Sequence, residues 1–302
     1  ASCLVGSEMC IRDRPMAIEK DILMAAAFEP ASTPRLRCEL HNAITHFAHS
    51  TFECDMTDPH SIELVHFGSK RWANYFKVVL LGLQSVLPPE VRQNAHGTIK
   101  VLVDGTVPPE SSLSSSAAMT TCSSIVILTA LKALHVVPRK VIADVACHSE
   151  RLVGVHSGGM DQAVSVFGQR DKALFVSFAP TLHVSPIELP LGHQYVFLVT
   201  NTMIKSDKKA TAPERYNLRV VETRLAAAVL KRVLQTKSDI PIQFRDTLRS
   251  VSDTFWAGHT GEWDKIVHEF DDVRHACNDL GLDAGHLQAM LNIVEHHIPV
   301  SY

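Results

Sequence analysis

The feature that most constrains the fold of this chain is a serine-rich loop between a strand-like segment and a helix-like segment. Residues 98–103 read Thr-Ile-Lys-Val-Leu-Val, a β-branched and partly alternating run that predicts a strand. Residues 117–134 are rich in Ala, Leu and Ile and contain neither Gly nor Pro, which predicts a helix. The loop between them contains three consecutive serines, Ser114, Ser115 and Ser116. This order of elements predicts a binding site for an anion.

The serine loop is suited to bind a phosphate group. A loop that enters a helix presents free backbone N–H groups and the positive end of the helix dipole, and serine hydroxyls add donors and a ligand for Mg²⁺. The anion that this arrangement predicts is a nucleotide phosphate. A simpler interpretation is that Ser114 only caps the helix, since serine is a favoured N-cap residue.

A second group of polar residues, in residues 149–162, combines two carboxylates with a glycine-rich turn and reads SERLVGVHSGGMDQ. Asp161 follows two glycines, which allow the backbone to approach a ligand closely, and precedes an apolar stretch that predicts a helix. Asp161 could instead be an ordinary helix N-cap. Glu150 lies near the end of an amphipathic run that begins at Arg139, where the default expectation is an exposed charge paired with a neighbour such as Arg151.

These stretches resemble the motifs of the GHMP small-molecule kinases and, within them, of the galactokinases. The family's phosphate loop reads approximately Pro-x-x-x-Gly-Leu-Ser-Ser-Ser-Ala, and residues 108–117 here read PPESSLSSSA. The family's base lies in Gly-x-Met-Asp-Gln, and residues 158–162 read GGMDQ. A third run, YNLRVVE at residues 216–222, is similar to the segment that follows the sugar pocket in fungal galactokinases. The resemblance implies ATP-dependent phosphorylation of galactose at the anomeric hydroxyl, which yields galactose 1-phosphate.

The resemblance also implies roles for individual residues, with ATP and Mg²⁺ as the cofactors. Asp161 would be the catalytic base or proton-positioning group. Glu150 and Ser116 would hold Mg²⁺. The residues implied in ATP binding are Ser112, Ser114, Ser115, Ser116, Asp207 and Lys208. Those implied in galactose binding are Gly158, Asp161 and Tyr216, although Tyr216 also fits a core aromatic with an exposed tip, and Lys208 a solvated lysine cluster.

The fold implied by the resemblance is α+β, the two-domain GHMP kinase fold with a first domain like domain 2 of ribosomal protein S5. We expect the ATP-binding domain in residues 15–185 and a helix-rich, partial second domain in residues 186–302, with Pro186 and Pro190 at the junction. Further expected elements are strands at 21–27, 172–178 and 195–201 and helices at 71–87 and 213–234. Residues 1–14 resemble the translated leader of a transcript-derived fragment and are excluded from the fold.

The sequence departs from the family in three places. The early family motif that supplies an arginine near the transferred phosphoryl group is not recognisable, and the glycine-rich third motif does not occur in residues 216–302. We therefore expect a chain truncated at both ends, which argues against full activity of these 302 residues alone. Ser112 stands where the family has glycine, and a positive φ there would cost about 1 kcal/mol or more.

The composition is that of a cytoplasmic enzyme for small molecules. Hydrophobic residues make up 46% of the chain and charged residues 20%, which excludes a disordered chain. A net charge of -3 gives no electrostatic reason to expect nucleic acid or a membrane as partner, and we expect a monomer that binds galactose and ATP. The seven scattered cysteines form no Cys-x-x-Cys pair and predict reduced thiols.

Two alternative functions remain open from the sequence. An N-acetylgalactosamine kinase would also carry the Pro-Pro dipeptide seen at residues 108–109, whereas the run at 216–219 favours galactose itself. A noncatalytic galactose- and ATP-binding transcriptional sensor resembles the enzyme but lacks a Ser-Ala pair in the serine loop. The pair Ser116-Ala117 is present here and favours a kinase.

Overall fold

The computed structural model describes residues 14–178 and 181–189, and single residues at positions 198, 200, 217, 220, 221, 223, 224, 227, 247, 248 and 250. The chain divides into two compact units, residues 1–217 and residues 218–302. The helices and strands with defined bounds belong to the first unit. Most of the expected strand at 195–201 and most of the expected helix at 213–234 lie outside the described residues. Residues 198 and 200 are described and are not in a strand, whereas the described positions from 217 to 227 are helical.

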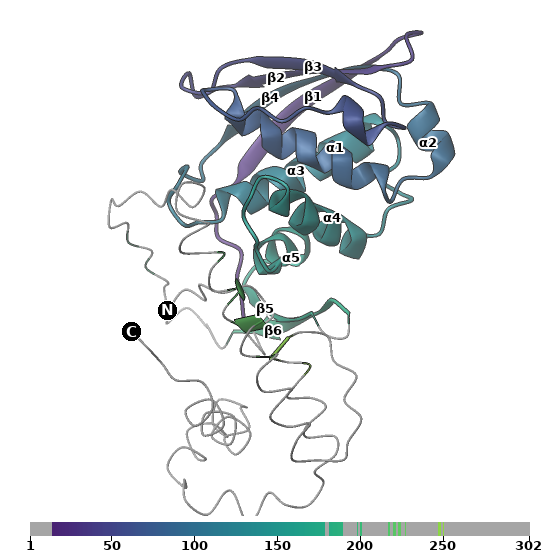
Figure 1. The fold of residues 1–302 in the computed structure, drawn as a ribbon. Coiled ribbons are helices and arrows are strands. Elements are labelled where there is room, and N and C mark those ends of the chain that lie inside the picture. Colours follow the sequence, from purple (N-terminus) through teal and green to yellow (C-terminus); the bar gives the residue numbers. More distant parts are fainter. Residues whose placement is uncertain are drawn as a thin grey trace, which may run out of the picture. The chain divides into compact units, whose positions relative to one another are not determined.

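A four-stranded mixed sheet forms one layer of the first unit (Figure 1). Its strands lie in the order β1 (Ile22–Pro30), β4 (Gly97–Gly105), β2 (Leu36–Asn42) and β3 (Ser50–Cys54). Strand β4 pairs antiparallel with β1 and parallel with β2, and β2 pairs antiparallel with β3. Buried and more exposed residues alternate along β2 and β4. One face of the sheet therefore covers the core and the other faces solvent.

The helices lie on the core side of this sheet, where some contact it and the others pack against those helices (Figure 1). They are α1 (Asn74–Gln84), α2 (Pro89–Gln93), α3 (Ser115–Ala130), α4 (Arg139–Arg151) and α5 (Met160–Phe167), with short 3-10 turns at η1 (Pro59–Ser61) and η2 (Arg71–Ala73). Strands β5 (Lys172–Ser177) and β6 (His183–Glu188) form a separate antiparallel pair, and β5 contacts α5. Within the described part of the chain, no helix has the length and apolar character needed to cross a bilayer.

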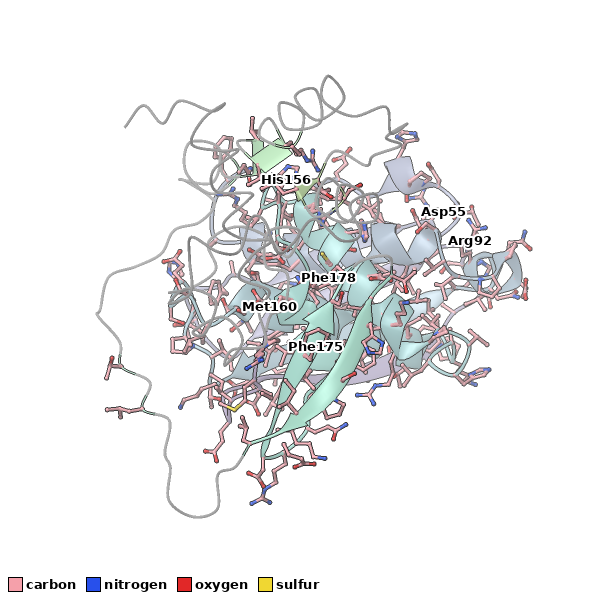
Figure 2. The ribbon with its side chains drawn as sticks, turned by 90° about the horizontal axis from the view of Figure 1, so that it is seen from below. Asp55, Arg92, His156, Met160, Phe175 and Phe178 are labelled. Atoms are coloured by element: carbon pink, nitrogen blue, oxygen red, sulfur yellow. The ribbon has the colours of Figure 1, made fainter. Side chains whose placement is uncertain are left out.

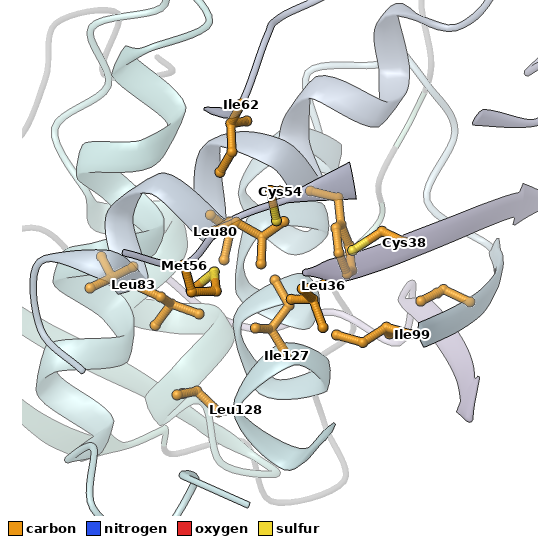
Figure 3. Packing of buried hydrophobic residues seen from close by; sticks show 14 of the residues in the cluster. Leu36, Cys38, Cys54, Met56, Ile62, Leu80, Leu83, Ile99, Ile127 and Leu128 are labelled. Carbon is orange, nitrogen blue, oxygen red and sulfur yellow. The ribbon is translucent and has the colours of Figure 1, made fainter. Parts of the chain in front are cut away.

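The main hydrophobic core lies between the sheet and the helices (Figure 3). Leu36 of β2, Ile99 of β4, Leu80 and Leu83 of α1, and Ile127 of α3 are all fully buried in it. Burying one such side chain stabilises the fold by about 1.5–3 kcal/mol. Because β4 and α3 are both anchored in this core, the two ends of the serine loop are fixed relative to each other.

The structure confirms the predicted α+β class and most of the predicted elements. The strands expected at 21–27, 98–103 and 172–178 are β1, β4 and β5, and the helices expected at 71–87 and 117–134 are η2 with α1, and α3. Strands β2, β3 and β6 were not predicted.

Pro186 lies inside β6, opposite Leu174, and not between two strands as expected. An edge strand tolerates proline. The domain boundary after residue 185 falls within β6 and stays a prediction.

Four cysteines lie among the described residues, and none of them forms a disulfide. They are Cys38, Cys54, Cys122 and Cys147. Burial raises the pKa of Cys122 and of Cys147 to about 11. These thiols are therefore protonated at neutral pH and are poor nucleophiles.

Candidate functional site

The serine loop between β4 and α3 has a backbone conformation that non-glycine residues rarely adopt. Glu110, Ser112 and Ser114 have φ angles of 57°, 59° and 60°. The left-handed region costs a non-glycine residue about 1–2 kcal/mol, and such strain is typical of functional sites. Alternation of left-handed residues with residues of ordinary φ makes successive N–H groups converge on an anion. Ser112 thus has the positive φ expected from its place in the loop.

Ser114 occupies the N-cap position of α3 but does not act as an ordinary cap. Its side chain makes no capping hydrogen bond to the helix backbone. The interpretation that this serine only caps the helix is therefore not supported. The first N–H groups of a helix have no acceptor within the helix, and they carry the positive end of its dipole. A phosphate oxygen would satisfy these donors.

The loop opens onto a pocket with a volume of about 310 Å³. All four serines predicted to bind ATP line this pocket, and so do the aromatic residues Phe47, Trp72 and Tyr75. The indole Nε1 of Trp72 donates a hydrogen bond to the carbonyl oxygen of Ala48 at 2.9 Å, which fixes the ring. Polar donors and aromatic surface in one pocket suit a nucleotide, which has phosphates and a planar base. These aromatic residues were not predicted to be part of the site, because nothing in their spacing indicates that they share a pocket with the serines.

Glu150 is buried near the end of α4, so the default expectation of an exposed charge was wrong. Its side chain is 3% exposed. Its Oε2 accepts hydrogen bonds from Ser157 Oγ at 2.9 Å and from Gln162 Nε2 at 2.5 Å, and it is also hydrogen-bonded to the side chain of Ser116. Burial raises the pKa of Glu150 above its ordinary value, the nearby charge of Asp161 adds to this rise, and the three hydrogen bonds oppose it.

Asp161 is the second residue of α5 and precedes Gln162, whose side chain is hydrogen-bonded to Glu150. The N-cap of α5 is Gly159, with a φ of 94°, so Asp161 is not the cap. A Cβ atom at Gly159 would lie 3.0 Å from Cys147 Sγ. Gly159 therefore allows the turn after Gly158 to pack closely against α4. The structure brings the predicted residues Ser116, Glu150 and Asp161 together from three separate helices.

The oxygen donors around Glu150 fit Mg²⁺, which prefers oxygen ligands. In residues 14–178 and 181–189, no lysine or arginine forms an ion pair with this buried carboxylate, and a buried charge needs such compensation. The described residues contain no group of three or more His, Cys, Asp or Glu side chains placed to hold a metal ion. That result is compatible with Mg²⁺, since Mg²⁺ often uses one or two carboxylates together with substrate phosphates and water.

The turn between α4 and α5 is held by Asn217, which was not predicted to have this role. Asn217 Nδ2 donates a hydrogen bond to the carbonyl oxygen of Gly154 at 3.1 Å, and the backbone N–H of His156 donates to Asn217 Oδ1 at 3.2 Å. Figure 2 labels His156, which lies in this turn, and Met160, where α5 begins. Asn217 belongs to the YNLRVVE run, but the sequence gives no sign of this contact. The other predicted ligand-binding residues, Asp207, Lys208 and Tyr216, lie outside the described residues.

Comparison with known proteins gives a consistent family relationship. Residues 74–169 match the family model of the GHMP kinases N terminal domain. The sequence is 33% identical to a galactokinase of Candida albicans, over 93% of this chain and 51% of that protein. It is 29% identical to a galactokinase of Schizosaccharomyces pombe, over 93% of this chain and 53% of that protein. The chain thus spans about half the length of these curated relatives.

A solved structure shows the same fold. The crystal structure of Lactococcus lactis galactokinase complexed with galactose matches with a TM-score of 0.56. The two sequences are 20% identical, and the match covers 89% of this chain and 61% of that one. The serine loop and α4 both lie within the matching family segment, as do Glu150 and Asp161.

Proposed function

We propose that this chain is a GHMP kinase and acts as a galactokinase, transferring the γ-phosphoryl group of ATP to the anomeric hydroxyl of galactose, because residues 74–169 match the GHMP kinases N terminal domain and the chain is similar to galactokinases. The observation that carries the proposal is the cluster of Ser116, Glu150 and Asp161 beside the strained serine loop. The relatives named galactokinase support galactose as the acceptor. So does the matching crystal structure, which is that of a galactokinase complexed with galactose.

In this proposal, ATP binds in the 310 Å³ pocket that the serine loop shares with Trp72. Backbone N–H groups and hydroxyls of Ser112, Ser114, Ser115 and Ser116 bind phosphate oxygens, and the aromatic side chains contact the base. Asp207 and Lys208 are proposed to complete the nucleotide site. Most catalysis of phosphoryl transfer comes from positioning and from offsetting charge, which is what this arrangement supplies.

Asp161 accepts or positions the proton of the sugar hydroxyl, and Gly158 and Tyr216 contact the sugar. Glu150 and Ser116 would hold Mg²⁺, which offsets the negative charge of the transferring phosphoryl group when it is bound. The hydrogen bonds from Ser157 and Gln162 keep the Glu150 carboxylate in a fixed orientation. We also propose a cytoplasmic monomer with the ATP-binding domain in residues 15–185.

The test is an ADP-release assay with galactose, with N-acetylgalactosamine and without sugar. It is run on this chain and on a chimaera that adds the parts of the Candida albicans galactokinase beyond the matched region. Galactose-dependent ADP release is expected in at least one of these two proteins. Asp161→Asn should lower turnover by about 10²- to 10⁴-fold, the usual contribution of a general base, and leave ADP binding unchanged. Asp171→Asn is the control, because Asp171 is an exposed aspartate whose side chain is 85% accessible.

Other outcomes would redirect the proposal. A preference for N-acetylgalactosamine would replace the substrate and keep the chemistry. Sugar-dependent nucleotide binding without ADP release in either protein would contradict catalysis and favour a sensor. Near-normal turnover of the Asp161→Asn variant would remove Asp161 from its proposed role.

A further inference from the structure

Gln162 is a buried glutamine that connects the two helices carrying the proposed acidic residues. It follows Asp161 on α5 and is completely buried. Its Nε2 donates to Glu150 Oε2 on α4 at 2.5 Å, while its Oε1 has no hydrogen-bond partner. A buried polar atom without a partner costs stability. An apolar side chain at this position would avoid that cost, so the glutamine calls for another explanation.

The orientation of the Gln162 amide is fixed by chemistry. A carboxylate accepts hydrogen bonds, so it must face the NH₂ group of the amide and not its carbonyl oxygen. The donated bond holds one oxygen of Glu150, together with the bond from Ser157. Partners of this kind orient a metal-binding carboxylate, and losing one typically costs about 10- to 100-fold in metal affinity.

We propose that Gln162 is a positioning residue that orients the Glu150 carboxylate for a divalent cation at the nucleotide phosphates and ties Asp161 to that site. This inference rests on the proposed nucleotide and Mg²⁺ site, but it does not depend on which sugar is phosphorylated. Gln162 touches neither the nucleotide nor the sugar in this assignment. Its effect reaches the metal only through Glu150.

The experiment measures Mn²⁺ binding by electron paramagnetic resonance on the full chain saturated with a nonhydrolysable ATP analogue. Gln162→Met keeps the length and volume of the side chain and removes the amide. The matched control is Gln84→Met, because Gln84 is also buried, donates through Nε2 to the carbonyl oxygen of Asp55 at 3.0 Å, and has an unpartnered Oε1. Thermal unfolding of both variants shows whether they are folded.

Gln162→Met is expected to raise the Kd for Mn²⁺ by about tenfold or more, with the affinity for the analogue unchanged. Gln84→Met should leave the Kd for Mn²⁺ within about twofold of that of the original chain. An unchanged Mn²⁺ Kd in folded Gln162→Met would overturn the role of Gln162. An original chain that binds the analogue but no Mn²⁺ would overturn both this inference and the Mg²⁺ assignment. Loss of Mn²⁺ affinity in Gln162→Met without any galactose phosphorylation would support Gln162 and contradict only the proposed function.

Discussion

Glu150 carries a cost in stability that its proposed role explains. The carboxyl group is buried and its pKa is raised, chiefly by burial, so its charged form is disfavoured in the folded protein. Nothing in the local sequence indicates this, because Ser149-Glu150-Arg151 is what an exposed helix end looks like. The burial results from Ser157 and Gln162, which follow the helix in the sequence and donate hydrogen bonds to the Glu150 carboxylate. The family motif, and not the pattern of the helix, pointed to this residue.

Replacing Glu150 by Gln should stabilise the metal-free protein at neutral pH. A carboxyl group whose pKa is raised in the folded state makes the folded protein less stable as pH rises from the ordinary Glu pKa, about 4.3, through the folded value. Glu150→Gln removes that penalty, so its advantage should be largest near pH 7 and shrink toward pH 4.5. Urea unfolding in EDTA across this pH range measures it.

The control for this prediction has the opposite sign. The pKa of Glu39 is lowered, first by its hydrogen bond from Arg37, so its charged form adds stability above the ordinary Glu pKa. Glu39→Gln should therefore be neutral or destabilising near pH 7. An unfolding free energy of Glu150→Gln that is equal to or below that of the original chain at pH 7 would contradict the assigned pKa direction.

At the scale of elements, helices were easier to predict than their ends and easier than the strands. The apolar run from residue 117 predicted α3, but the helix ends at Ala130 and not at residue 134. Lys132 adopts a φ of 55°, and the backbone N–H of Ala133 bonds back to the carbonyl oxygen of Leu128, which closes the helix end. Strand β2 has a clear alternation of buried Leu36, Cys38 and Leu40 that could have been recognised.

The start of α5 depends on the small size of Gly159. Gly159 and Gly154 both have a φ of 94°, but a Cβ at Gly159 would meet Cys147 Sγ at 3.0 Å and Phe178 Cε1 at 3.2 Å, while a Cβ at Gly154 would meet nothing within 4 Å. Both alanine variants should lose about 1 kcal/mol or more through backbone strain. Gly159→Ala should lose more, since neighbouring side chains must also move.

Urea unfolding of the two variants measures this difference, with Gly154→Ala as the control for backbone strain alone. Gly159→Ala should also lower turnover more than Gly154→Ala, because it displaces the turn that leads to Asp161. Equal losses of stability in the two variants would show that the contact with Cys147 is not close enough to matter.

At the scale of the whole molecule, the pocket proposed to bind the nucleotide is formed by the first unit alone. The residues that line the pocket lie between Ile22 and Val155, all within the first unit. Of the residues proposed to contact the sugar, Tyr216 lies outside the described residues. The pocket's aromatic wall could not be foreseen, since Phe47 and Trp72 meet the serine loop only through tertiary structure.

Nucleotide binding should therefore occur in this chain without sugar, and Trp72 should report it. The chain has three tryptophans, Trp72, Trp256 and Trp263, of which Trp72 lines the pocket. ADP without galactose should change the tryptophan fluorescence, because a base placed against the indole alters its surroundings. Trp72→Phe should lose most of that change, whereas Trp256→Phe and Trp263→Phe should keep it. A Trp72→Phe variant that retains the full change would place the nucleotide outside the pocket formed by the serine loop.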